Sequence, residues 1–94
     1  MKPLKRVVLE VNRAVAVGFR DGFDRGLALL RAIETGHVVG YLPYHAALGS
    51  LAERAGDRDT AASAYQVAAN LSRTRVDREF FEARMKSLTD PRQA

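Results

Sequence analysis

Apolar residues recur every three or four positions along most of this chain, which is the spacing of one face of an α-helix. Glycine, proline and polar residues interrupt the pattern and divide it into five predicted helices. We expect a first hairpin over residues 4–35, a connector over 36–43, a second hairpin over 44–72 and a final helix over 76–89. The pattern therefore predicts an all-α fold in a single domain, residues 1–94.

The first predicted helix, residues 4–19, is apolar on more than one side. At roughly 100° per residue, one broad face holds Val7, Val8, Val11, Ala14, Val15, Gly18 and Phe19. Leu9, Ala16 and Val17 fall outside it, and a helix of this kind is normally covered on two sides. Valine is also common in strands, and residues 9, 11, 15 and 17 alternate, so a β-strand is the competing interpretation.

Residues that start or stop helices mark the predicted boundaries. They are Asp24 before the second helix, Gly36 after it, Pro43 before the third, Asp57 or Asp59 before the fourth, and Thr74 with Asp77 before the last. The apolar connector should pack under the hairpins as an extended link or short turn, or with a two-residue strand. The last helix should carry an apolar stripe of Val76, Phe80, Phe81, Met85 and Leu88.

Small residues stand where neighbouring helices are expected to touch. Gly49 lies in the third predicted helix, and the fourth carries Ala61, Ala64, Tyr65 and Ala68. A small residue lets another backbone come close, and Tyr65 would fill the gap beside it. This spacing predicts an antiparallel helical hairpin, the unit of tetratricopeptide-like arrays, with the last helix as a cap on the exposed end.

A series of short motifs runs through these helices in a fixed order. They are residues 12–17 (NRAVAV), 21–22 (DG), 26–30 (GLALL), 44–47 (YHAA), 56–58 (GDR), the alanines and tyrosine of the fourth helix, 78–81 (REFF) and Arg84. Their order resembles the C-terminal extension of a group of extracytoplasmic-function sigma factors. These bacterial RNA polymerase sigma factors carry a tetratricopeptide-like domain after their DNA-binding regions.

The resemblance implies a cytoplasmic, non-catalytic domain that regulates transcription initiation through protein interactions. Its partner would be an RNA polymerase-associated protein or the upstream regions of the same sigma factor. Nothing in this chain corresponds to the regions of such proteins that bind core polymerase and promoter DNA. We therefore expect either a fragment, whose promoter-reading activity lies elsewhere, or a freestanding relative, for instance a homo-oligomeric scaffold.

Composition excludes several classes of protein. The 47% hydrophobic and 28% charged residues are typical of a soluble domain, and the absence of cysteine excludes disulfides and thiolate metal sites, in keeping with a reducing cytosol. The apolar segment 7–19 is too short and too polar for a membrane span or signal peptide. His37 and His45 lack a third ligand at a suitable spacing, and the serines lack a paired base, so we expect no metal, no cofactor and no enzymatic activity.

The net charge of +4 favours an acidic partner. The basic residues are mixed with acids along the chain, which disfavours direct DNA contact. The alternative function is a nucleic-acid contact through Arg73, Arg75 and Arg78, helped by Lys2, Lys5 and Arg6.

Docking is expected on the face formed by the first and third helices. The residues proposed for it are Val8, Asn12, Arg13 and Val15 from the first helix and His45 and Glu53 from the third. If the surplus apolar surface of the first helix is exposed, a homodimer through that helix is a natural consequence. A structural spacer that binds nothing is the remaining interpretation.

Overall fold

The computed structural model describes residues 3–90 and 92, and within them the fold is all-α. The elements are α1 (Pro3–Asp21), α2 (Phe23–Arg31), the short 3-10 helix η1 (Thr35–His37), α3 (Leu42–Ala55), α4 (Arg58–Leu71) and α5 (Arg75–Thr89). The residues that could also have formed a strand, 9–17, lie inside α1. The predicted all-α fold of five helices is confirmed.

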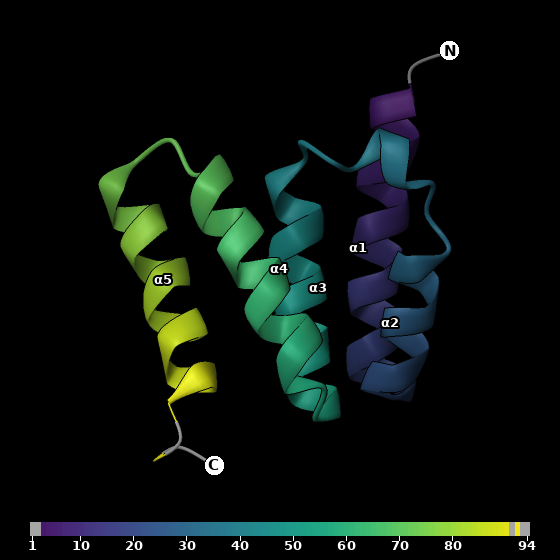
Figure 1. Ribbon diagram of the computed structural model, residues 1–94. Coiled ribbons are helices and arrows are strands. Elements are labelled where there is room, and N and C mark those ends of the chain that lie inside the picture. The colour runs from purple at the N-terminus through teal and green to yellow at the C-terminus, as the bar shows by residue number, and fades with distance from the viewer. Residues whose placement is uncertain (1–2, 91, 93–94) are drawn as a thin grey trace.

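Consecutive helices pack as antiparallel hairpins (Figure 1). α1 packs against α2 and α3 against α4, while α2 and α3 join the two hairpins and α5 covers the far side of α4. α1, α3 and α5 therefore run in one direction, and α2 and α4 run in the other. The result is an elongated slab with extents of 46 × 31 × 18 Å.

Close backbone contact joins the first hairpin. A Cβ atom at Gly26 of α2 would lie 2.7 Å from the carbonyl oxygen of Ala14 and 2.8 Å from the Cα of Gly18, both in α1. The same atom would lie 2.9 Å from Leu51 of α3. Only glycine therefore fits where α1, α2 and α3 meet.

The second hairpin is built on the predicted contact between glycine and tyrosine. A Cβ atom at Gly49 of α3 would lie 2.7 Å from Cε1 of Tyr65, so the ring of Tyr65 fills the space beside the glycine. Ala61, Ala64 and Ala68 are buried in the same helix as Tyr65, as the spacing predicts. Tyr65 in turn stacks on Phe81 of α5, with ring centroids 6.2 Å apart.

The boundaries of α2 differ from the prediction. Gly22, at φ 126°, precedes the helix, so Asp24 lies in the first turn and is not the cap. α2 ends at Arg31 instead of near Thr35. Ile33 and Val38 are both buried, yet in a continued helix they would lie roughly 140° apart. Leaving the helix early lets both side chains reach the core, and η1 forms in the connector.

Two predicted caps are present. Asp57, rather than Asp59, caps α4 and accepts a hydrogen bond from the backbone N–H of Thr60 at 3.1 Å. Thr74 caps α5 and accepts one from the backbone N–H of Asp77 at 3.1 Å. The third helix begins at Leu42, slightly before the predicted start, with proline in its first turn.

The prediction that the last helix carries a single apolar stripe is wrong. Phe81 and Leu88 are buried against α4, whereas Val76 and Phe80 are 76% and 57% exposed. Successive residues in a helix are about 100° apart, so Phe80 and Phe81 face in different directions. The apolar residues of α5 therefore form two faces, of which one is covered.

The apolar residues of the connector also differ in burial, because Val38 is buried and Val39 is exposed.

Candidate partner-binding surfaces

One side of α1 presents apolar residues that the rest of the fold leaves open. We call it the α1 outer face, formed by Val8, Leu9, Asn12, Val15, Ala16 and Phe19. Leu9 and Phe19 are 64% and 58% exposed, and Val8 and Val15 are half-buried. The opposite side of the helix supplies Val7, Val11 and Ala14 to the core. The predicted surplus of apolar surface on this helix is therefore present.

Basic side chains border the α1 outer face. Lys5, Arg13 and Arg20 are exposed along α1, and Arg20 pairs with the neighbouring Asp21 at 3.0 Å. On the side of α3, the guanidinium of Arg54 lies over the ring of Phe19, 5.2 Å from its centroid. A guanidinium near an aromatic face is attracted to it, which holds Arg54 at this border. The surface thus combines apolar side chains around Asn12 with positive edges.

The α1 outer face contains half of the residues predicted for docking. Val8, Asn12 and Val15 belong to it, and Arg13 is an exposed residue at its border. Phe19 and Leu9 were not among the predicted binding residues, although they are the most exposed apolar side chains of this face. The position of Leu9 outside the main apolar face was the signal that could have indicated it, whereas the pattern placed Phe19 within the main face.

The two residues predicted from the third helix lie elsewhere. His45 Nε2 is within hydrogen-bonding distance of the carbonyl oxygen of Val39, at 3.1 Å, and its ring meets Tyr44 edge-on. His45 lines a hollow of about 350 Å³ between α3 and α4, together with Leu48, Asp59, Thr60, Ser63, Ala64 and Val67. Glu53 faces α4 and α5. The structure does not bring either residue to the α1 outer face.

Glu53 joins three helices. Its carboxylate accepts hydrogen bonds from the hydroxyl of Tyr65 at 3.0 Å and from the guanidinium of Arg84. Burial alone would raise the pKa of Glu53, but the bonds from Arg84 and Tyr65 outweigh it and the pKa is lowered. Burial, and then the bond to Glu53, raises the pKa of Tyr65. The arrangement fastens α3 to α4 and α5, which is a structural role.

Other arginines also bridge helices, which sequence spacing did not reveal. Arg31 of α2 pairs with Asp57, the cap of α4, at 3.2 Å. Arg58 of α4 donates a hydrogen bond to the carbonyl oxygen of Leu88, at 2.7 Å, near the end of α5. The partners are 26 and 30 residues apart, and no local pattern links residues at such separations. Part of the basic surplus therefore serves the fold.

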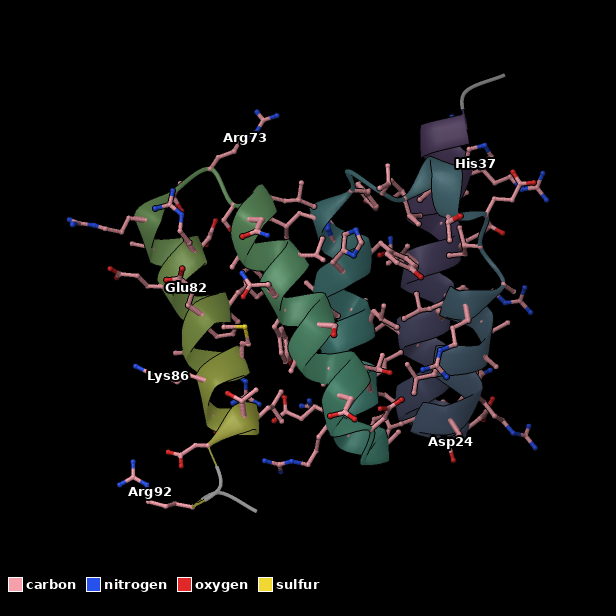
Figure 2. The ribbon with its side chains drawn as sticks, viewed as in Figure 1. Asp24, His37, Arg73, Glu82, Lys86 and Arg92 are labelled. Atoms are coloured by element: carbon pink, nitrogen blue, oxygen red, sulfur yellow. The ribbon has the colours of Figure 1, made fainter. Side chains whose placement is uncertain are left out.

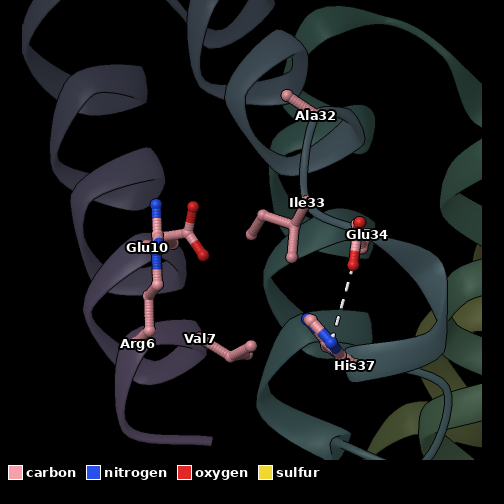
Figure 3. Close-up of a pocket in the computed structure, with 7 residues that line it drawn as sticks. All are labelled: Arg6, Val7, Glu10, Ala32, Ile33, Glu34 and His37. Carbon is pink, nitrogen blue, oxygen red and sulfur yellow. Dashed lines mark ion pairs between the residues drawn. The ribbon is translucent and has the colours of Figure 1, made fainter. Parts of the chain in front are cut away.

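A second hollow, of about 380 Å³, lies between α1 and the α2–η1 junction (Figure 3). It is lined by Arg6, Val7, Glu10, Ala32, Ile33, Glu34 and His37. His37 Nε2 lies 3.5 Å from a carboxylate oxygen of Glu34. The lining mixes acidic and basic groups over apolar residues, so it selects no ligand by charge.

The basic residues of the nucleic-acid alternative form two separate groups. Arg73, Arg75 and Arg78 are exposed around the start of α5, and Figure 2 shows Arg73 pointing away from the helices. Lys5 and Arg6 are exposed at the start of α1, at the other edge of the slab (Figure 1). Lys2 lies outside the described residues. The two groups therefore share an end of the molecule without forming one stripe.

Among residues 3–90 and 92, no cluster of three histidine or acidic side chains is placed to hold a metal ion. None of the described helices combines the length and apolarity that crossing a bilayer requires. Comparison of the chain with protein-family models, curated proteins and solved structures gave no match.

Proposed function

We propose that this chain is a non-catalytic protein-interaction domain that binds an acidic amphipathic helix along the α1 outer face. The observation that carries the proposal is an open apolar surface with basic borders. An amphipathic helix can lay its apolar side on such a surface. Acidic residues beside that apolar side would meet Lys5, Arg13 and Arg54, which favours association and selects the partner by charge.

The fold supports a binding role for this surface. α1 packs closely on α2 at Gly18 and Gly26, and this close packing favours an outer face that needs little reorganisation on binding. Exposed leucine and phenylalanine side chains on one helix face are typical of interaction sites when they form a continuous patch. Leu9 and Phe19 are ten positions apart on α1, which spans 19 residues. The surface is therefore long enough for several turns of a partner helix.

We propose further that the partner belongs to the transcription-initiation machinery. It would be an RNA polymerase-associated protein or an upstream region of a sigma-factor-like parent. The order of motifs that resembles the sigma-factor extension supports this proposal. Its first motif, residues 12–17, contributes Asn12, Val15 and Ala16 to the α1 outer face and Arg13 to its border. The resemblance thus includes surface residues as well as residues that pack the core.

Binding can be tested with two synthetic peptides of about 15 residues, long enough for four helical turns. Both carry leucines on one helix face; one has glutamates beside them and the other lysines. We expect the acidic peptide to bind at least about tenfold more tightly. Titrations followed by amide NMR shifts should map it to the α1 outer face. Equal affinity for the two peptides would contradict the proposal.

Leu9→Glu and Val76→Glu form a matched pair of variants. Each places a carboxylate at an exposed apolar position, one on α1 and the other on α5. Circular dichroism should show that both variants are folded, and only L9E should lose binding of the acidic peptide.

Amide NMR shifts centred on Arg73, Arg75 and Arg78 would instead indicate the nucleic-acid alternative. Failure of the wild-type chain to bind purified bacterial RNA polymerase holoenzyme, or a sigma factor, would contradict the transcription assignment alone.

A further inference from the structure

α5 leaves a second apolar stripe open, on a surface that the proposed function does not use. The α5 outer stripe consists of Val76, Phe80, Ala83 and Ser87, all of them exposed. Their spacing of four, three and four positions is that of the contact line between two long helices. In the part of the chain that the structure describes, α5 packs against α4 and reaches α3 through the bond from Arg84 to Glu53. Figure 1 shows it at the edge of the slab.

Charged residues flank the stripe in a definite order. Glu79 and Lys86 lie along one side, and Asp77 and Arg84 along the other. Lys86 extends away from α4 (Figure 2). Within residues 3–90 and 92, no ion pair joins Asp77, Glu79 or Lys86 to another side chain. Arg84 bonds to Glu53, and its side chain remains 41% exposed.

We propose that two copies of this chain associate through antiparallel pairing of their α5 helices. In an antiparallel pair each residue of the contact line faces its counterpart from the other end of the second helix. Phe80 then meets the partner's Ala83, and Val76 meets the partner's Ser87. A large side chain is placed opposite a small one in every layer, which is how two helix surfaces interlock without voids.

The same pairing matches every flanking charge. It sets Glu79 beside the partner's Lys86 on one side and Asp77 beside the partner's Arg84 on the other. By two-fold symmetry each contact occurs twice, so four opposite-charge pairs border the contact line. A parallel pair would instead set Phe80 against Phe80 and Ala83 against Ala83.

The α1 outer face does not offer this complementarity. An antiparallel pair of α1 helices along Leu9, Asn12, Ala16 and Phe19 would place Arg13 beside the partner's Arg13. It would also place Arg6 beside the partner's Arg20. Like charges opposed across such a contact are unfavourable. The two surfaces therefore suit different occupants: an acidic helix on α1 and a second copy on α5.

Variants with reversed charges, compared by sedimentation, test the pairing of the α5 helices. The wild-type chain should show a monomer–dimer equilibrium that shifts to dimer with concentration; a single helix pair buries little area, so we expect a weak dimer, in the range of about 10–500 µM. Glu79→Lys and Lys86→Glu should each raise the dissociation constant at least about tenfold. An equimolar mixture of the two variants should restore dimer, because every lysine then faces a glutamate.

The matched controls change residues on other surfaces. Arg13→Glu reverses a charge on α1 and should leave the dimer unchanged, while Phe80→Glu should abolish it. Thermal unfolding of each variant checks that the fold is retained. A wild-type chain that stays monomeric at every concentration overturns the proposal. So does dimerisation that Arg13→Glu removes, or a variant mixture that shows no recovery. None of these results bears on peptide binding by α1.

Discussion

At the scale of single residues, the tightest constraint in this molecule is the contact between Gly26 of α2 and the α1 backbone. The two nearest atoms that a Cβ at Gly26 would meet belong to the main chain of Ala14 and Gly18. A side chain could turn aside, but a helix backbone cannot move without displacing its neighbours. By comparison, the three atoms nearest to a Cβ at Gly49 belong to the ring of Tyr65.

Gly26→Ala should therefore destabilise the protein by about 2 kcal/mol, even though alanine favours the helix by about 1 kcal/mol over glycine. Urea unfolding measures the change. Gly36→Ala is the control, because a Cβ atom there meets nothing within 4 Å, and it should alter stability by less than about 0.5 kcal/mol. Equal effects of the two substitutions would contradict the close approach of α1 and α2.

At the scale of elements, the start of α4 depends on one of two nearby acids. Asp57 accepts the hydrogen bond of the Thr60 amide and also pairs with Arg31, whereas Asp59 lies inside the first turn. Asp57→Ala should lower the melting temperature by about 4–8 °C through loss of the cap. Asp59→Ala should lower it by no more than about 2 °C. A larger loss from the second substitution would reverse this assignment.

Elements with strong periodicity and clear end signals could be predicted from the sequence. The bounds of α3 and α4 follow from Pro43, Gly56 and the spacing of the alanines. The contact between Gly49 and Tyr65 follows from the same pattern. The end of α2 could not be predicted, because the need to bury both Ile33 and Val38 is tertiary. The two faces of α5 were missed because a helical repeat identifies apolar residues without saying which of them a neighbour covers.

The candidate site was predictable only in part. Val8, Asn12 and Val15 were identified because the surplus of apolar residues on the first helix is visible in its pattern. Glu53 was assigned to docking because its partners, Tyr65 and Arg84, are 12 and 31 residues away. Contacts at such distances depend on how helices are packed, and the chain pattern does not contain that information.

At the scale of the whole molecule, Glu53 makes stability depend on pH. Its pKa is lowered in the folded protein, although burial opposes this, because Arg84 and Tyr65 bond to the carboxylate. The stabilisation is present above the unfolded pKa of about 4.3 and disappears as the pH falls through the folded value. Glu53→Gln should cost about 1 kcal/mol at pH 7.

The cost of Glu53→Gln should shrink as the pH falls below about 4, because protonation removes the same charge from the wild-type carboxylate. Melting temperatures of both proteins between about pH 2 and 7 test this. Asp57, whose pKa is lowered chiefly by its bonds from Thr60, remains in both and gives each a residual acid dependence. A difference that stays constant over the whole range would show that the carboxylate is not charged in its bonds to Arg84 and Tyr65.

The common direction of α1, α3 and α5 makes the slab electrically polar. These helices hold 19, 14 and 15 residues and begin at one end, against 9 and 14 residues in the two that begin at the other. Helix starts carry partial positive charge, and Lys5, Arg6, Arg73 and Arg75 stand at that end. An approaching acidic molecule is therefore turned before contact, so that its negative end meets the three helix starts first.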